Sequence, residues 1–340
     1  MPTEPASPSL VSGIDPSAGP ALDDEIDFED LLGKTSRTFA LSIPHLPEPT
    51  RREVTLAYLL FRIADTFEDA ATWAPGQRRE ALERFGRLLA EPASEEAERL
   101  AALWSETVPC AQPGYRELLV RMPAVLDATY ALDAEASEIV RAYARRTVLG
   151  MADFVDRMTD RGELVLSDLV DLRQYCYVVA GIVGELLTEL LLLDRPELLP
   201  VAEELRSRSR DFGEGLQLVN ILKDAAGDAT EGRTYLPPGV PREEVFALAR
   251  RDLRLAGEYV RTIQLAGAAR GIVAFNALPA RLAIASLDRL EEKGPGAKVS
   301  RPELFKIIAR LEKALDAGEP PVPAPDAREL AEIAASIWTG

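Results

Sequence analysis

The sequence is poor in the side chains that most enzymes use for nucleophilic or zinc chemistry. Its 340 residues contain one histidine, His45, and two cysteines, Cys110 and Cys176. Because His45 lies between Pro44 and Pro47, a histidine-based triad or a zinc site is close to excluded. The cysteines lack the spacing of metal ligands, so we expect two reduced, buried thiols in a cytosolic protein.

Positive charge is also scarce. The chain has 39 lysines and arginines against 56 aspartates and glutamates, which gives a formal net charge of −17 and a pI near 4.7. Nucleic acid is therefore excluded as a partner, because proteins that bind phosphate backbones carry an excess of Lys and Arg. Any anionic ligand must be bound by local groups of basic residues.

Long apolar runs are absent as well. The most apolar block, Ile182 to Leu193, is interrupted by Gly184, Glu185, Thr188 and Glu189. It is too short and too charged to span a bilayer. We expect a cytoplasmic protein, with at most a peripheral membrane contact for product release, and the oligomeric state is left open.

What the sequence has in abundance is helical periodicity. Nearly half of its residues are hydrophobic, and Pro and Gly punctuate long segments of period 3.6, while hairpin-bounded alternating runs are missing. We predict a disordered tail over residues 1–25, which does not resemble a signal peptide, and one all-α domain over 26–340. A capping box at Thr50 and Glu53 is expected to begin one helix. Further helices are expected near 76–90, 94–106, 114–131, 135–160, 167–192, 199–227, 241–267, 270–292, 301–316 and 325–338.

Two of these helices carry acidic faces. In a helix, positions i, i+3 and i+4 point the same way, as do i, i+4 and i+8. If the two faces met in a partly buried cleft, each close pair of carboxylates would repel by about 4 kcal/mol at an effective dielectric near 20. Oxygen ligands without histidine or cysteine favour Mg²⁺, with Mn²⁺ also possible. The first face has Asp65, Glu68 and Asp69, and the second has Asn220, Asp224 and Asp228.

The helix predicted at 167–192 contains two glycines, Gly181 and Gly184, each of which costs about 1 kcal/mol relative to alanine. One interpretation is close packing against a neighbouring helix, and the other is room or a kink beside a bulky ligand. Tyr175, Val179 and Ile182 lie on one stripe, which predicts an apolar wall with a single hydroxyl.

Paired acidic helices, scattered basic residues and an apolar pocket together suit a prenyl diphosphate. Mg²⁺ and basic groups stabilise the departing pyrophosphate, and an apolar pocket shields the resulting allylic cation from water. Aromatic faces can stabilise that cation further.

Several motifs carry a family resemblance. Together they resemble the squalene/phytoene synthase family of head-to-head trans-prenyl transferases, over roughly Leu31 to Leu311. The motifs are Ser36-Arg37-Thr38-Phe39-Ala40, the run Tyr58 to Asp69, the run Tyr175 to Gly184, and Gln217 to Asp224 with the loop Gly232 to Pro237.

The resemblance implies a single-domain isoprenoid synthase fold of the class I terpenoid synthase type, with helices around a central pocket. It also implies the site. The catalytic residues would be Tyr175, Tyr58, Arg62 and Phe39. Substrate would be bound by Ser36, Arg37, Arg62, Gln217, Lys223 and Arg233. The metal ligands would be Asp65, Glu68, Asp69, Asn220, Asp224 and Asp228.

Two positions depart from the family pattern in the second acidic motif. The pattern reads Asp-x-x-Glu-Asp, and Gly227 replaces its glutamate here. Lys223 stands where arginine is usual, and lysine lacks the bidentate fork. We expect weaker metal binding and a looser grip on diphosphate.

Within the family, Asp-Thr-Phe-Glu-Asp at 65–69 and the segment Phe275 to Leu287 resemble squalene synthases, whereas the loop after the second motif looks more like bacterial phytoene synthases. The expected reaction joins two farnesyl diphosphates through presqualene diphosphate and gives squalene with NADPH. Phytoene, dehydrosqualene or hydroxysqualene synthesis is the alternative. A terpene cyclase and a non-catalytic assembly factor on the same fold stay open, as do prenyl chain length and NADPH use.

Overall fold

The computed structural model describes residues 26–36, 38–108, 112–230 and 232–323. The predicted tail at 1–25, Arg37, Cys110 and the helix predicted at 325–338 lie outside the described residues. The described chain is helical almost throughout, which confirms the predicted fold class.

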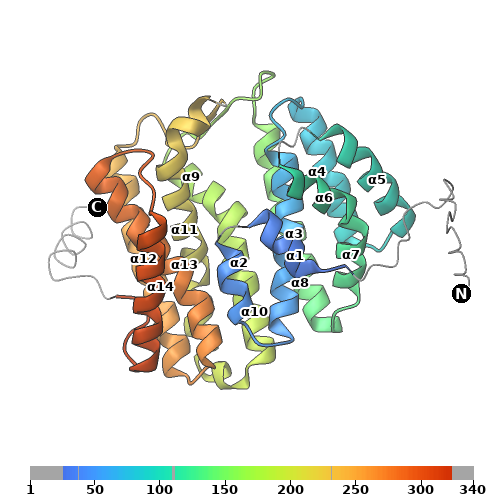
Figure 1. Ribbon diagram of the computed structural model, residues 1–340. Helices are drawn as coiled ribbons and strands as arrows, with labels where there is room; N and C mark the ends of the chain where they lie inside the picture. The colour runs from blue at the N-terminus through green and yellow to red at the C-terminus, as the bar shows by residue number, and fades with distance from the viewer. Residues whose placement is uncertain (1–25, 37, 109–111, 231, 324–340) are drawn as a thin grey trace, which may run out of the picture.

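The first half of the chain forms one side of the helical array and part of its centre (Figure 1). Helix α3 lies in the middle, where it packs against α8 and α10, and α4 lies along α8. The elements are α1 (Phe28–Thr35), α2 (Phe39–Ser42), α3 (Thr50–Glu68), α4 (Pro75–Ala90), α5 (Ser94–Thr107), α6 (Pro113–Val120), α7 (Met122–Tyr130) and α8 (Ala134–Asp156).

The second half completes the centre and forms the opposite side. Helix α11 packs against α10, α12 and α13, and α14 covers α13. The elements are β1 (Leu164–Val165), α9 (Leu169–Cys176), α10 (Ile182–Asp194), α11 (Ala202–Thr230), β2 (Arg233–Thr234), α12 (Arg242–Leu265), α13 (Arg270–Lys293) and α14 (Arg301–Asp316).

Helix α3 begins where the sequence predicts, but by another mechanism. Thr50 is its first helical residue, and its hydroxyl donates to Asp194 Oδ2 at 2.6 Å instead of capping the helix. Glu53 is 2% exposed, and burial, followed by the charge of Asp194, raises its pKa. The predicted capping box is therefore wrong, because a tertiary contact with the end of α10 uses the threonine.

The helix predicted at 114–131 is two helices. Helix α6 ends at Val120, and α7 begins at Met122 with Pro123 in its first turn. Proline has no N–H to donate and its ring clashes with the preceding turn, so a continuous helix is broken at this point.

The helix predicted at 167–192 contains a change of winding. Between α9 and α10, residues Tyr177–Gly181 form a π-helical turn. Helix α10 then lies close to α11: a Cβ built on Gly184 would come within 2.0 Å of the Ser209 carbonyl oxygen. A Cβ on Gly213 would come equally close to the carbonyl oxygen of Ala180. Close packing against a neighbour is thus the reason for Gly184, and the π turn supplies a local irregularity as well.

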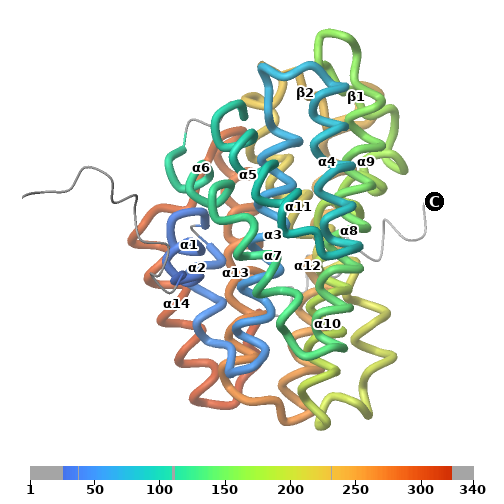
Figure 2. The backbone as a smooth tube through the Cα atoms, turned by 90° about the vertical axis from the view of Figure 1, so that its right-hand side faces the viewer, coloured from blue at the N-terminus to red at the C-terminus, as the bar shows by residue number. Residues whose placement is uncertain are grey.

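The predicted helices did not include α1 and α2, and a two-stranded parallel sheet was not predicted either. Leu164 pairs with Arg233 and Val165 with Thr234, at one end of the helical array (Figure 2). Strands of two residues leave no alternating pattern long enough to be recognised in a sequence.

Two helical stretches among the described residues are long and apolar enough to cross a membrane by length and composition, Leu169–Asp194 and Arg270–Lys293. More than half of each apolar window is buried inside the fold, as in the core helices of soluble proteins. This is weak support for a membrane span.

Candidate active site

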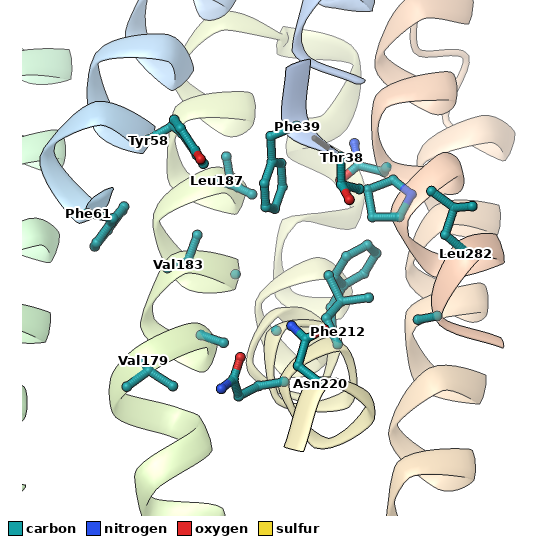
Figure 3. A pocket seen from close by; sticks show the side chains of 18 of the residues that line it. Thr38, Phe39, Tyr58, Phe61, Val179, Val183, Leu187, Phe212, Asn220 and Leu282 are labelled. Atoms are coloured by element: carbon teal, nitrogen blue, oxygen red, sulfur yellow. The ribbon is translucent and has the colours of Figure 1, made fainter. Parts of the chain in front are cut away.

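A cavity of about 350 Å³ lies between the central helices. Helices α2, α3, α10, α11 and α13 each contribute to its wall, and side chains from all of them point into the same space (Figure 3). The apolar part of the wall is built from aromatic and aliphatic side chains that include Phe39, Phe61, Val183, Leu187, Phe212 and Leu282.

Polar side chains gather on the last turns of α3 and the middle of α11. The cavity is lined there by Arg62, Asp65, Gln217, Asn220 and Lys223. All five come from the two acidic helices α3 and α11, so the fold brings the two motifs, more than 150 positions apart, to one cavity. An apolar chamber with a few convergent polar groups is the usual form of a small-molecule site.

On the α3 side, Arg62 contacts the rings of two tyrosines. Its Nε donates to the Tyr58 hydroxyl at 3.2 Å, and its guanidinium lies 5.5 Å from the ring centre of Tyr58 and 5.4 Å from that of Tyr115. Its Nη1 lies 3.2 Å from Asp65 Oδ2. Partial burial and the nearby charge of Asp69 raise the pKa of Asp65 to about 6, against the opposing effect of Arg62. Sequence reasoning missed Tyr115, whose position in the chain gave no signal.

On the α11 side, Lys223 is the nearest cation to the second motif. Its Nζ donates to Asn220 Oδ1 at 2.9 Å and lies 3.3 Å from Asp224 Oδ2. Asp224 is half exposed, and a side chain at Gly227 would meet nothing within 4 Å. Both departures from the family pattern therefore lie on an accessible face beside the acidic residues.

Arg233 connects the two motifs. Its guanidinium lies 3.5 Å from Asp69 Oδ1 and 3.7 Å from Asp228 Oδ1, and the residue is 8% exposed. A single buried cation thus lies between carboxylates of the first and second motifs, which shows that positive charge is stabilised at this place.

Glu68 faces away from the cavity into a buried tyrosine pair. The Tyr175 hydroxyl lies 3.3 Å from Glu68 Oε1 and 3.0 Å from the Tyr235 hydroxyl. Burial, together with Asp69 and Asp65, raises the pKa of Glu68 to about 8. Of the predicted stripe, Val179 lines the cavity, whereas Tyr175 and Ile182 are buried outside its lining. Val179 belongs to the π turn at Tyr177–Gly181, whereas Tyr175 lies in α9 before it, so the stripe predicted for a regular α-helix is not preserved.

The remaining predicted residues are placed as follows. Ser36 Oγ accepts a hydrogen bond from the Phe39 backbone N–H at 2.9 Å, so the hydroxyl stabilises the turn into α2. The Phe39 ring lies 5.6 Å from that of Tyr58, centre to centre, and both line the cavity. Gln217 also lines it, and Arg37 lies outside the described residues.

The donor set fits Mg²⁺. All candidate ligands offer oxygen, and a basic side chain already bridges the two motifs. Mg²⁺ is usually bound by one or two carboxylates, with waters and substrate phosphates completing its octahedron. Asp65 and Asn220 line the cavity, whereas Asp69 and Asp228 contact Arg233 outside its lining. An open arrangement with one carboxylate at the cavity suits that mode of binding.

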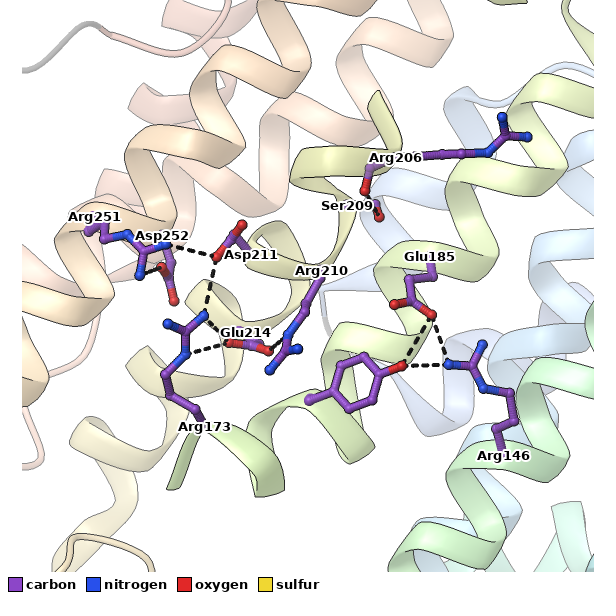
Figure 4. A network of polar contacts seen from close by, with 11 residues as sticks. Arg146, Arg173, Glu185, Arg206, Ser209, Arg210, Asp211, Glu214, Arg251 and Asp252 are labelled. Carbon is purple, nitrogen blue, oxygen red and sulfur yellow. Dashed lines mark hydrogen bonds and ion pairs between the residues drawn. The ribbon is translucent and has the colours of Figure 1, made fainter. Parts of the chain in front are cut away.

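A different carboxylate cluster is much tighter but is already neutralised (Figure 4). The oxygens of Asp211, Glu214 and Asp252 lie within 4.8 Å of one another. Arg173 contacts Glu214 and Asp211, Arg210 contacts Glu214, and Arg251 contacts Asp211 and Asp252. Three arginines accompany three carboxylates, so this cluster is an ion-pair network between α9, α11 and α12, in which both buried oxygens of Asp252 have no hydrogen-bond partner among the described residues. Charge balance distinguishes it from the acidic face of α3.

Comparison with known proteins agrees with this geometry. A family model described as squalene/phytoene synthase matches residues 32–306. The chain belongs to the squalene/phytoene synthase family. This family consists of enzymes of the prenyl transferase type, and the resemblance inferred from the motifs is confirmed.

Individual family members are similar over part of their length. The chain is 29% identical to the squalene synthase of Eremothecium gossypii over 67% of this chain and 50% of that protein. It is 30% identical to the squalene synthase of Saccharomyces cerevisiae over 67% of this chain and 48% of that protein. The chain thus spans about half the length of the curated relatives it matches.

Solved structures confirm the fold. The complex of TcSQS with the ligand BPH1237 superposes with a TM-score of 0.70 at 22% identity, covering 90% of this chain and 95% of that chain. A dehydrosqualene synthase complex gives a TM-score of 0.51 at 20% identity, covering 85% and 95%. Both superpositions show that this chain shares the helical fold of these synthases.

The departures at Lys223 and Gly227 lead to a prediction. Lys223→Arg restores a bidentate fork, and Gly227→Glu adds a carboxylate at an open position. Each change is expected to lower, by about two- to fivefold, the substrate or Mg²⁺ concentration for half-maximal rate, since a charge-assisted hydrogen bond contributes about 1 kcal/mol. Steady-state titrations measure this. Glu83→Gln on the exposed face of α4 is the control, and unchanged or higher requirements in both variants would show that diphosphate is bound elsewhere.

Proposed function

We propose that this protein joins two prenyl diphosphates head to head, and that these are two farnesyl diphosphates converted through presqualene diphosphate to squalene with NADPH. The observation that carries the proposal is a single cavity whose polar end is lined by residues of both acidic motifs and whose remaining wall is apolar. A diphosphate with a long hydrocarbon chain has the matching polarity.

The metal ligands in this proposal are Asp65, Asp69, Asn220, Asp224 and Asp228, with Glu68 behind them. Mg²⁺ would neutralise the diphosphate and favour its departure. Arg62, Lys223 and Arg233 would bind diphosphate oxygens, and Gln217 would hydrogen-bond at the same end. Arg233 is suited to this because it already contacts one carboxylate from each motif.

The proposed organic steps are those of a head-to-head condensation. The C1–O bond of one substrate breaks, and the double bond of the other attacks C1. Loss of one proton then closes a cyclopropane. Phe39 and Tyr58 would face the cation with their rings, and the apolar wall would exclude water from it. The released pyrophosphate would take the proton directly, whereas Tyr175 lies outside the cavity lining and would act on it through Glu68, giving up its own hydroxyl proton as it accepts another. A second ionisation and rearrangement, ended by hydride from NADPH, gives squalene.

Product analysis tests the proposal. With farnesyl diphosphate and Mg²⁺ alone, we expect presqualene diphosphate to accumulate, with slow release of dehydrosqualene-like or hydroxylated products. Adding NADPH is expected to convert most of the carbon to squalene, because hydride competes with water and proton loss for the same cation. The products are separated by chromatography and identified by mass spectrometry.

The same assay decides among the alternatives. A matched incubation with geranylgeranyl diphosphate serves as the comparison. If NADPH changes neither the rate nor the product and geranylgeranyl diphosphate gives phytoene, the squalene proposal fails. A single cyclised product from one prenyl diphosphate would instead indicate a terpene cyclase.

The cellular setting belongs to the proposal too. We propose a cytoplasmic protein that meets a membrane peripherally, because a hydrocarbon product must leave an apolar cavity for an apolar phase. Co-sedimentation with lipid vesicles, in the presence and absence of product, measures this contact.

A further inference from the structure

The loop after the second acidic motif contributes a residue that none of the sequence arguments selected. We propose that Tyr235 is a positioning residue for Tyr175, and that it holds the Tyr175 hydroxyl beside the first acidic motif. The effect of Tyr235 on the reaction rests on the proposed function, in which Tyr175 takes part. The structural role of Tyr235 in holding the Tyr175 side chain does not depend on that function.

The backbone before Tyr235 is fixed by the small parallel sheet. The N–H of Leu164 donates to the Gly232 carbonyl at 3.0 Å, and that of Leu166 to the Thr234 carbonyl at 3.1 Å. Gly232 has φ +80°, a conformation that favours glycine, at the start of this pairing. Because the peptide that joins Thr234 to Tyr235 is paired with β1, the ladder fixes the backbone from which the Tyr235 side chain extends.

The ring of Tyr235 closes one side of the Tyr175 ring. The two rings are stacked, with centres 4.6 Å apart and planes 24° apart. Phe154 meets Tyr175 edge-on at 5.1 Å and 88°. Tyr175 is 4% exposed and Tyr235 is 8% exposed, so the contacts are packed. Aromatic pairs of this kind contribute about 0.5–1.5 kcal/mol beyond the area they bury.

The hydroxyl groups of Tyr175 and Tyr235 constrain each other's hydrogen-bond directions. Tyr175 has one hydroxyl proton, and its oxygen lies within hydrogen-bonding distance of both Glu68 Oε1 and the Tyr235 hydroxyl. It can donate to only one of them at a time. When it donates to the Glu68 carboxylate, the Tyr235 hydroxyl must donate to Tyr175 for both contacts to hold. Tyr235 therefore helps determine where the Tyr175 proton points.

Tyr235 is not among the residues that line the cavity, so it does not belong to the binding surface. Its removal is expected to affect the alignment of Tyr175 and to leave substrate binding nearly unchanged. A misalignment of about 1 Å can cost about a hundredfold in rate. A split between kcat and KM thus distinguishes positioning from binding.

The test uses two variants. Tyr235→Phe keeps the stacked ring and removes the hydroxyl, and is expected to lower kcat about three- to tenfold. Tyr235→Leu removes both and is expected to lower kcat by about ten- to a hundredfold, with KM within about twofold of wild type. Rates are measured as presqualene diphosphate formed from farnesyl diphosphate and Mg²⁺. If Tyr235→Leu does not fold, Tyr235→Phe carries the test.

A second readout does not depend on turnover. In protein labelled with 3-fluorotyrosine, the ¹⁹F resonance of Tyr175 is assigned by its loss in Tyr175→Phe. Both Tyr235 variants are expected to shift or broaden it. The control is Tyr130→Phe, which removes a hydroxyl that donates to the Leu88 carbonyl at 2.8 Å, a contact that involves neither Tyr175 nor Tyr235. It should change neither the Tyr175 resonance nor kcat.

The two readouts separate the proposals. An unmoved Tyr175 resonance overturns the positioning role, and so does an unchanged kcat in variants of an active wild type. If the wild type makes no presqualene diphosphate while the resonance moves as expected, Tyr235 still positions Tyr175 and the proposed function is what fails.

Discussion

Asp65→Asn is expected to lower turnover by about a thousandfold, and Asp224→Asn by a similar factor. Each removes a carboxylate charge from one of the two motifs, and a metal ion that stabilises a departing diphosphate contributes several kcal/mol to the transition state, at about 1.4 kcal/mol per tenfold. Pyrophosphate release from farnesyl diphosphate measures the rate, with EDTA as the parallel metal-free sample.

The fold should survive both changes. Burial, together with the charge of Asp69, raises the pKa of Asp65 against the opposing effect of Arg62, so a neutral side chain is easier to bury in the metal-free protein. Thermal unfolding checks this. Asp156→Asn is the matched control, because Asp156 at the end of α8 forms an exposed ion pair with Arg79 of α4. This variant should retain full activity. Full activity of either motif variant, or of wild type in EDTA, would disprove the metal site.

Gly213→Ala is expected to lower the free energy of unfolding by about 2 kcal/mol or more. The new Cβ would lie 2.0 Å from the Ala180 carbonyl oxygen and 3.0 Å from the Gly181 Cα. Both are backbone atoms, so no side-chain rotation relieves the overlap and α11 must move away from the π turn. Because Gly213 and Ala180 line the cavity, the same movement should also lower activity. Urea unfolding measures the change.

The control lies in the same helix. Gly227 has no neighbour within 4 Å of a built Cβ, so Gly227→Ala should raise the free energy of unfolding by up to about 1 kcal/mol through helix propensity. The two glycine variants of α11 are thus expected to change stability in opposite directions. A destabilisation by Gly227→Ala equal to that by Gly213→Ala would contradict the packing explanation.

Local chemistry was enough to predict the helices and the acidic faces. The 3.6-residue period of apolar positions places most helices within a few residues of their observed bounds, because burial of one face drives helix formation. The spacing of Asn220, Asp224 and Asp228 likewise determines that they share a face, since all three lie within the uninterrupted α11.

Tertiary contacts decided the finer geometry. The start of α3 depends on Asp194, the winding changes to a π turn at Tyr177–Gly181 just after Tyr175, and the β1–β2 pair fixes the backbone that leads into Tyr235. Each involves residues far apart in the chain or a change of winding that has no periodic signature. Sequence reasoning selected Arg233 in the loop but not Tyr235. The rings of Tyr175 and Tyr235 stack although the residues lie 60 positions apart, and the spacing of residues within a helix cannot reveal such a contact.

The sequence by itself thus determined an all-α chain with two acidic helices and the family to which their motifs belong, because period and spacing are properties of a single helix. Only the tertiary structure decided which of those side chains meet. Arg233 lies between Asp69 and Asp228, Glu68 turns to a tyrosine pair, and the tightest carboxylate cluster lies elsewhere, neutralised by arginines. The physical reason is that distances between helices depend on how their side chains pack, and packing is a property of the whole chain.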